Sequence, residues 1–287
     1  MERFSAFLQT QKQLSDATVN SYIRDVMLFS DFLEKPAAEG TEKDVEAFIR
    51  YLKSEGRAPS TIARFLSSLH AYFRYLTARE GLPCDPTANI PRPETERRLP
   101  LILTEEEVSR LLSAPAGDSP KAIRDRAMLE LLYATGVRVS ELINLHVDNV
   151  NLRRRMLSLR TGGRRRAIPF GRPCALALSD YLKQARPFLL RGNGTAALFL
   201  STNGSEMSRQ GFWKLIKHYK EIAGIDKEIT PHMLRHSFAA HLLENGADIT
   251  AVSEMMGFLD PSSTAIYTKI IENKIMDVYD KAHPRAN

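Results

Sequence analysis

The stretch Tyr133-Ala-Thr-Gly-Val-Arg-Val-Ser-Glu-Leu142 predicts a helix that ends at Gly136 and a second helix that begins at Arg138. An arginine at such a corner lies near backbone amides and the positive end of a helix, which is a favourable setting for a phosphate. A surface arginine that pairs with Glu141, three residues further on, is the alternative. On this stretch alone the ion pair is favoured.

A second polar cluster lies in the stretch Thr230-Pro-His-Met-Leu-Arg-His-Ser-Phe-Ala-Ala-His241. Thr230 is a typical N-cap residue, so His232 and Arg235 are expected on one face of the first helical turns, where an anion is stabilised. Arg235 can hold two phosphate oxygens, and His232 can exchange a proton near neutral pH. A capped helix in which His232 makes only a structural hydrogen bond is the alternative.

His232 and His236 also have the i, i+4 spacing of metal ligands. A zinc site needs a third ligand, and His241 is expected off that face. Cys84 and Cys174 are far apart in the sequence, and neither has a second cysteine nearby. We therefore expect neither a metal site nor a disulfide framework.

The third cluster surrounds Tyr267 in Met255-Met-Gly-Phe-Leu-Asp-Pro-Ser-Ser-Thr-Ala-Ile-Tyr-Thr-Lys269, where a helix over 261–278 is predicted. A phenol is a weak nucleophile at its ordinary pKa of about 10, so neighbouring positive charge is needed to stabilise its phenolate. A core tyrosine that packs against Ile266 and Ile270 is the alternative, and this stretch alone favours it.

Taken together, Arg138, His232-x-x-Arg235 and Tyr267 resemble, in order and approximate spacing, the signature of the tyrosine recombinases, also called the phage integrase family. The text around each of them is similar too, most of all to the compact Xer branch. The N-terminal helices resemble the family's SAM-like core-binding domain, so the likeness spans nearly the whole chain.

This resemblance implies site-specific recombination of double-stranded DNA without metal, ATP or another cofactor. Two domains would clamp a duplex, and Tyr267 would form a 3′-phosphotyrosyl bond on a path through a Holliday junction. Arg138 and Arg235 would hold the non-bridging oxygens while His232 assists proton transfer. The role would be chromosome-dimer resolution, tied to chromosome partition and cell division, or integration and excision of a mobile element.

The resemblance also implies assembly on DNA as a homo- or hetero-tetramer, with a possible partner recombinase. The segment 270–282 has an apolar face, which would pack either on a neighbouring protomer or on its own domain. A type IB topoisomerase shares the chemistry, but the compact length and the Xer-like text argue against it.

Two positions depart from the family pattern. Phe258 replaces the usual histidine or tryptophan and cannot donate a hydrogen bond, and the β-hairpin Leu159-Arg-Thr-Gly-Gly-Arg-Arg-Arg-Ala-Ile-Pro169 lacks the usual lysine. Arg160, Arg164 or Arg165 would occupy the space, although an arginine holds its proton too tightly to be an efficient acid. These departures leave open a catalytically weak or inactive DNA-binding protein of the same fold.

Basic residues are in excess, with a net charge of +6 and a pI of about 9.3. Residues 153–166 are dense in arginine, which predicts phosphate contacts that add affinity without sequence selectivity; an ordinary charged hairpin is the alternative. The predicted DNA-binding residues are Arg153, Arg154, Arg155, Arg160, Arg164, Arg165 and Arg166 there, and Arg57 and Arg64, with Ser60 and Thr61, in the N-terminal half. Weaker candidates are Lys214, Lys217 and Lys220.

Helical periodicity predicts a four-helix unit over 1–82 and a mainly helical domain with one small sheet, near 148–170, over 101–287. The family resemblance implies that these are the core-binding domain and the catalytic domain. The proline-rich segment 83–100 is typical of an extended linker. Helices of the second domain are expected near 104–113, 119–135, 139–145, 173–186, 207–223, 231–244, 248–256 and 261–278. The sequence shows no signal peptide and no membrane-spanning stretch, so we expect a cytoplasmic protein.

Overall fold

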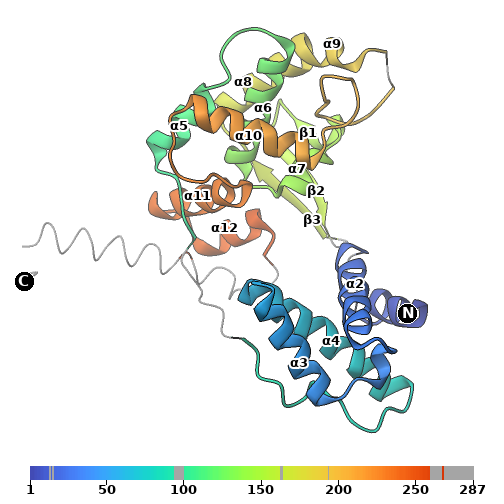
Figure 1. Cartoon of the computed structure of the whole chain (residues 1–287). Coiled ribbons are helices and arrows are strands. Elements are labelled where there is room, and N and C mark those ends of the chain that lie inside the picture. Colours follow the sequence, from blue (N-terminus) through green and yellow to red (C-terminus); the bar gives the residue numbers. More distant parts are fainter. Residues whose placement is uncertain are drawn as a thin grey trace, which may run out of the picture. The chain divides into compact units, whose positions relative to one another are not determined.

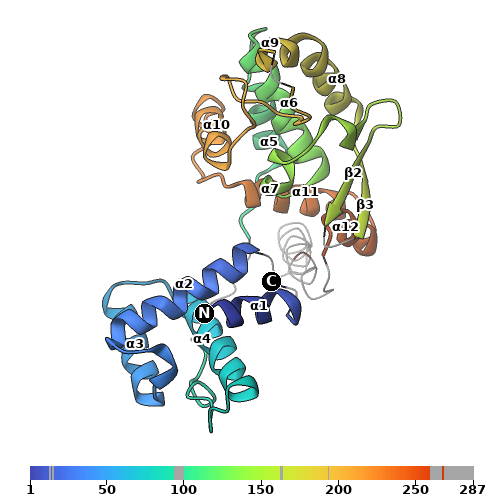
Figure 2. The same ribbon diagram turned by 90° about the vertical axis from the view of Figure 1, so that its right-hand side faces the viewer.

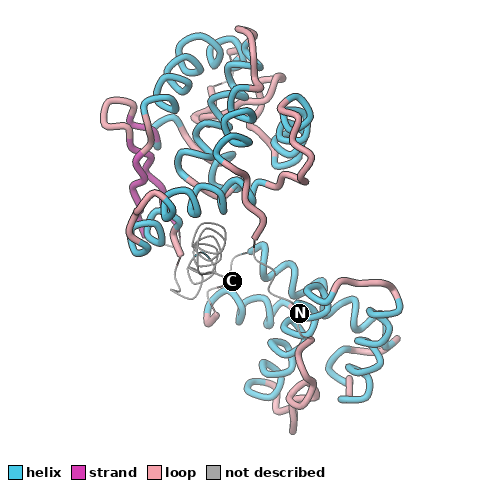
Figure 3. Tube along the Cα trace, turned by 90° about the vertical axis from the view of Figure 1, so that its left-hand side faces the viewer, coloured by secondary structure: helices cyan, strands magenta, loops and turns pink. Residues whose placement is uncertain are grey.

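The computed structural model describes residues 1–12, 14, 16–93, 100–161, 164–192, 194–258 and Tyr267. Contacts within the chain divide it into two compact units, Met1–Arg98 and Leu99–Asn287. Both units are mainly helical (Figure 1), and the strands are confined to one small part of the C-terminal unit (Figure 3). The predicted mainly helical fold with a small sheet is confirmed.

The N-terminal unit packs its helices around an aromatic core. Its described elements are α1 (Glu2–Thr10), α2 (Asp16–Leu33), a 3-10 turn (Ala37–Glu39), α3 (Glu42–Ser54) and α4 (Pro59–Arg79). Thr41 and Asp44 form the predicted capping box at the start of α3, each side chain accepting a hydrogen bond from the other's amide. The buried rings of Phe29 and Phe48 lie 5.2 Å apart and join α2 to α3.

The first part of the predicted linker packs on this unit. His70 Nδ1, on α4, lies 2.8 Å from Thr87 Oγ1 and 3.2 Å from Asp85 Oδ2, and Ile90 is buried against the core of the unit. Side-chain hydrogen bonds and apolar burial therefore hold residues that the proline pattern alone assigns to an extended connection.

The C-terminal unit combines helices with one small sheet, which lies at the edge of the unit (Figure 3). Its helices are α5 (Glu105–Ser113), α6 (Pro120–Thr135), α7 (Val139–Ile143), α8 (Arg172–Asp180), α9 (Arg186–Leu190), α10 (Arg209–Ile222), α11 (Pro231–Glu244) and α12 (Ile249–Met256), with a 3-10 turn (Val147–Asn149) and a π-helical turn (Tyr181–Ala185). The strands are β1 (Val150–Asn151), β2 (Met156–Thr161) and β3 (Arg164–Pro169), paired antiparallel in that order.

The predicted helices agree with these elements except at two places. The helix expected to end at 186 continues to Leu190, because Pro187 falls in the first turn of α9 after a π-helical turn, where its missing N–H does least harm. The helix predicted over 261–278 and the segment 270–282 lie outside the described residues, apart from the helical Tyr267. No helix in the described ranges is long and apolar enough to cross a membrane.

Helix α6 is the central helix of the C-terminal unit, with buried residues on all of its faces. Asp125 on this helix is fully buried and accepts hydrogen bonds from Arg124, at 2.8 and 2.5 Å, and from Lys121 at 2.9 Å. The hydroxyl of Tyr219 adds a fourth hydrogen bond at 3.0 Å and joins α6 to α10. These donors satisfy the buried carboxylate oxygens in place of water.

Helix α11, which carries His232 and Arg235, is tied to the start of the unit. The Leu103 amide donates to Ser237 Oγ at 2.8 Å, and the Leu103 carbonyl lies 2.9 Å from His241 Nε2. Because Nε2 faces a carbonyl it carries the ring hydrogen, and Nδ1 accepts from the Tyr133 hydroxyl of α6 at 2.8 Å. These contacts fix the rotation of α11 against α6.

Candidate active site

Arg138 lies at the corner between α6 and α7. Gly136 ends α6 with φ 56°, and a Cβ there would lie 2.2 Å from the Phe238 ring, so only glycine fits. The Arg138 amide donates to Glu141 Oε2 at 2.8 Å, and its Nη1 lies 3.5 Å from Glu141 Oε1. Its side chain is 37% exposed, so Arg138 makes the ion pair and still presents donors to solvent.

Helix α11 begins where the sequence predicts. Thr230 caps it by accepting a hydrogen bond from the Met233 amide at 3.1 Å. His232 lies exposed on the first turn. An exposed imidazole on the first turn of a helix can approach an anion without any rearrangement of the core.

Arg235 lies one turn further along and is 5% exposed. Its guanidinium donates to the carbonyls of Gly136 and Met256, at the C-terminal ends of α6 and α12. Burial, followed by the positive charge of Arg138, lowers the pKa of Arg235 to about 10. The guanidinium is therefore charged at neutral pH, in a place where positive charge is in surplus.

Arg166, one of the predicted DNA-binding residues, has a largely covered side chain. Its side chain is 9% exposed, and Nη2 donates to Glu141 at 2.6 Å while Nη1 donates to the Met256 carbonyl at 2.8 Å. Its buried Nε has no hydrogen-bond partner among the described residues. Figure 2 shows β3, which carries Arg166, next to α12, and Gly257 allows this approach because a Cβ there would lie 1.9 Å from Nη1.

Three guanidinium groups thus share two acceptors. Glu141 binds both Arg138 and Arg166, and the Met256 carbonyl binds both Arg166 and Arg235. Burial alone would raise the pKa of Glu141, but the Arg138 amide and the charges of Arg166, Arg138 and Arg235 hold it below its ordinary value. Three positive charges against one negative charge leave a surplus that favours binding of an anion such as a phosphodiester.

Tyr267 is fully buried, with its hydroxyl oxygen 2.7 Å from His236 Nδ1. Its neighbours include the apolar side chains Phe238, Val252 and Met256. Burial raises the pKa of Tyr267 to about 12, although the charge of Arg235 opposes this shift. The ring therefore packs among apolar side chains, as the alternative of a core tyrosine expects. The hydroxyl contacts a polar partner, His236, next to Arg235 of the arginine cluster.

Phe258 lies between the arginine cluster and the tyrosine. The Arg235 guanidinium carbon is 5.5 Å from the centre of the Phe258 ring, and the Phe258 and Tyr267 rings are 6.2 Å apart. Phe258 therefore contributes a cation–π contact and apolar packing where a hydrogen-bond donor is usual in the resembled family.

The other arginines of the hairpin region whose side chains are described are exposed. Arg153, Arg154 and Arg155 lie in the turn between β1 and β2, and Arg160 and Arg165 lie opposite each other on β2 and β3. Arg164 is opposite Thr161, and its side chain lies outside the described residues. Within the described residues, none of these exposed arginines forms a hydrogen bond or ion pair with the arginine cluster around Glu141, so these residues identify no substitute for the hairpin lysine.

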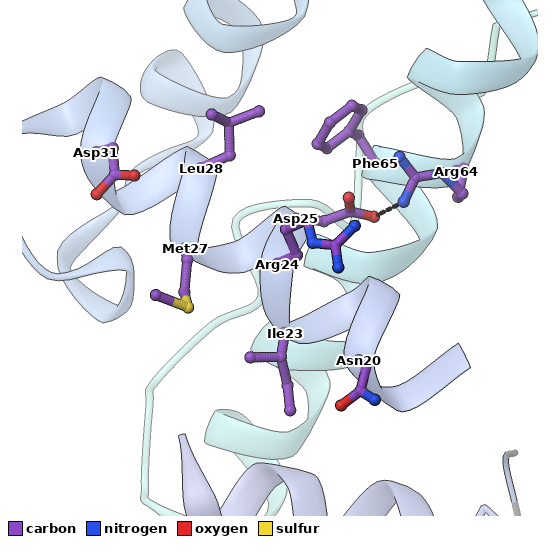
Figure 4. Close-up of a pocket in the computed structure, with 9 residues that line it drawn as sticks. All are labelled: Asn20, Ile23, Arg24, Asp25, Met27, Leu28, Asp31, Arg64 and Phe65. Carbon is purple, nitrogen blue, oxygen red and sulfur yellow. Dashed lines mark hydrogen bonds and ion pairs between the residues drawn. The ribbon is translucent and has the colours of Figure 1, made fainter. Parts of the chain in front are cut away.

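The N-terminal candidates lie on the turn before α4 and on its first turns. Arg57 and Ser60 are exposed and Thr61 is half-buried. Arg64 points at the buried Asp25 of α2, with which it pairs (Figure 4). Its Nη1 also donates to Ser21 Oγ at 2.8 Å. Its side chain is still 42% exposed, so Asp25 holds the guanidinium in one direction while leaving donors free for a phosphate.

The other polar candidates add little to the site. On α10, Lys214 and Lys217 are exposed and Lys220 is half-buried, as on a solvated helix face. Within the described ranges, no group of three histidine, cysteine or acidic side chains is arranged to hold a metal ion.

Three residues of the cluster escape simple pattern analysis. His236 stands out only as half of a metal pair, and Glu141 only as the partner of a surface arginine. For Arg166 a signal exists: Arg166, Ile168 and Phe170 alternate along β3 with exposed residues, which places Arg166 on the inward face. His236 has no such signal, because its partner is 31 residues away in the chain.

Comparisons with known proteins agree with this geometry. The profile of the phage integrase family matches residues 102–274, and that of the phage integrase N-terminal SAM-like domain matches residues 1–80. The chain therefore belongs to the phage integrase family, and the resemblance found in its sequence is confirmed.

The chain is also similar to individual recombinases. The chain is 39% identical over 293 residues to the tyrosine recombinase XerD of Listeria innocua, covering 100% of this chain and 99% of that one. It is 40% identical over 291 residues to XerD of Staphylococcus epidermidis, with the same coverage. The crystal structure of XerA recombinase matches with 27% identity and a TM-score of 0.56 over 99% of this chain and 98% of that one.

A post-cleavage complex of the XerH recombinase with palindromic difH substrate matches with a TM-score of 0.75 and 20% identity, over 91% of this chain and 79% of that one. At this identity the likeness shows a shared fold.

Proposed function

We propose that this chain is a site-specific tyrosine recombinase, which cuts and rejoins DNA through a covalent bond between Tyr267 and a 3′ phosphate. One observation carries the proposal: the Tyr267 hydroxyl is held on α11 one residue from Arg235, and Arg235 is joined to Arg138 and Arg166 through shared acceptors. A nucleophile and a concentration of positive charge are the two requirements for attack on a phosphodiester.

The geometry suggests a division of roles. Arg235 and the partly exposed Arg138 bind the non-bridging oxygens of the phosphate. Arg166 and Glu141 hold these two arginines in place. Exposed His232 exchanges protons with the substrate. Arg235 and Tyr267 are closed to solvent in this structure, so we propose that Arg235 exchanges its carbonyl contacts for phosphate oxygens when DNA binds.

Cleavage needs no external energy source in this scheme. The phosphotyrosyl bond keeps the energy of the phosphodiester it replaces, and attack by a 5′ hydroxyl reverses the step on a new strand. The alternative, a protein that binds DNA without cutting it, is not favoured, because all four residues of the signature are present and the relatives are recombinases.

DNA is the partner that the surface supports. The exposed arginines of the β1–β2 turn and of the hairpin lie in the same unit as the site, and Arg57 and Arg64 offer a second set in the N-terminal unit. We propose further that residues 1–82 and 101–287 act as the two DNA-binding domains, that four protomers assemble on two duplexes, and that the protein works in the cytoplasm on chromosomal or mobile-element DNA.

The test uses a pool of nicked duplexes with random sequence ahead of the nick. Cleavage close to a nick releases a short strand that diffuses away, which traps the covalent complex. Wild-type protein is expected to form an adduct that survives denaturant, and the recovered DNA gives the target half-site. Absence of any adduct, at DNA concentrations that saturate binding, would contradict the proposal.

A further inference from the structure

The phenol of Tyr267 has a direct side-chain partner outside the four-residue signature. His236 follows Arg235 on α11, with Nδ1 2.7 Å from the Tyr267 hydroxyl oxygen and the two rings 5.6 Å apart. Tyr267 is fully buried and His236 is half-buried. A buried hydroxyl needs a protein partner in place of water, and this imidazole supplies it.

The direction of this hydrogen bond follows from the charges around it. Burial, followed by the nearby His232 and Arg235, lowers the pKa of His236 to about 4, so the ring is neutral at pH 7. Tyr267 keeps its proton because burial raises its pKa to about 12. A protonated phenol therefore donates to Nδ1, and the ring's own hydrogen is on Nε2.

We propose that His236 is a further catalytic residue, which accepts the Tyr267 proton when the phenol attacks phosphorus; this rests on the proposed function of the site. The O–H bond of the phenol breaks as its oxygen bonds to phosphorus, and the proton moves to Nδ1. The bond from phosphorus to the 5′ oxygen breaks, and that oxygen takes a proton from solvent to leave as a hydroxyl.

Bound phosphate makes this transfer easier. The charged or titratable groups that act on His236 are His232 and Arg235 on its own helix and Tyr267 opposite; Arg138, Arg166 and Glu141 surround Arg235. Their surplus positive charge disfavours an imidazolium in the DNA-free protein. A phosphodiester neutralises part of that charge, so the same event that delivers the substrate makes His236 a better base.

The experiment compares His236→Gln, which keeps an acceptor but cannot take a proton, with His236→Phe, which keeps only the ring shape. His218→Gln, on the exposed side of α10, is the matched control. Each protein is mixed with the half-site recovered by the wild type, and the rate of adduct formation is measured from pH 6 to about 9.5, below the raised pKa of the nucleophile.

Both His236 variants should form the adduct about 100-fold more slowly at neutral pH, and the deficit should narrow as rising pH lets hydroxide take the proton. His218→Gln should match the wild type. A half-site with sulfur in place of the 5′ bridging oxygen, which needs no proton to leave, should not restore the rate.

Rates of His236→Gln within a few-fold of the wild type, faster rates, or rescue by the sulfur substrate would each overturn the proposal.

Gel shift and Trp213 emission show whether the variants fold and bind. If neither folds, nitrogen NMR of histidine-labelled wild type still decides: His236 Nδ1 must be unprotonated at pH 7. Failure of the wild type itself to form an adduct would count against the recombinase proposal, and an adduct unaffected by His236→Gln would count against His236 alone.

Discussion

Replacing Gly257 by alanine tests the packing that holds the arginine cluster together. Gly257 has φ 64°, and an added Cβ would lie 1.9 Å from Nη1 of Arg166. The left-handed backbone alone costs an alanine about 1 kcal/mol. Displacing Arg166 weakens its charged hydrogen bonds to Met256 and Glu141, which adds about 3 kcal/mol. We therefore expect a total loss of stability of about 4 kcal/mol.

Gly224 provides the matched control, because it has a similar φ of 60° and no atom within 4 Å of an added Cβ. Gly224→Ala should cost only the backbone strain, about 1 kcal/mol. Urea unfolding followed by Trp213 emission measures both, since this single tryptophan lies on α10 and reports on the C-terminal unit alone. Equal losses for the two variants would refute the packing of Arg166 against Gly257.

Three further predictions concern charge. Glu141→Gln should lower the stability of the C-terminal unit by about 3–5 kcal/mol, because it leaves the covered Arg166 without its carboxylate partner. In an Arg166→Met background the same substitution should cost much less. Additive losses of the two substitutions in urea unfolding would contradict the pairing. The pKa of Glu141 is lower in the folded protein than in the unfolded chain, so the carboxylate stabilises the fold fully above the ordinary value of 4.5, and this stabilisation is lost as the pH falls through the lower folded pKa. Glu141→Gln should lack this loss of stability in acid unfolding. Identical acid unfolding profiles for the variant and the wild type would count against this prediction. Replacing Arg153, Arg154 and Arg155 by glutamine should reduce the slope of log affinity for duplex DNA against log salt by about 0.9 for each lost phosphate contact; a filter-binding titration with an unchanged slope would show that the turn does not touch DNA.

Local features of this protein were predictable from the sequence because local interactions determine them. The capping residue Thr230 starts its helix as expected, and Gly136 ends α6 in the left-handed conformation that glycine favours. Order and spacing of four polar residues were enough to indicate the family, although each stretch alone favoured an ordinary structural role.

What the sequence could not show depends on contacts between distant residues. The carbonyl of Met256 accepts from Arg166, 90 positions away, and from Arg235, so it joins β3 to α11. No periodicity marks a backbone carbonyl as a shared acceptor. The partner of Tyr267 was likewise hidden, because the tertiary fold alone brings His236 to its hydroxyl.

The most direct test of the central claim is to map the covalent adduct. Wild-type protein and Tyr267→Phe, with Arg138→Lys and Arg235→Lys as variants that keep the charge, are incubated with the nicked half-site, and the digested adduct is sequenced by mass spectrometry. We expect a nucleotide attached to Tyr267 in the wild type, none in Tyr267→Phe, and strongly reduced amounts in both lysine variants despite DNA binding. An adduct that persists in Tyr267→Phe, or that maps to another side chain, would contradict the account.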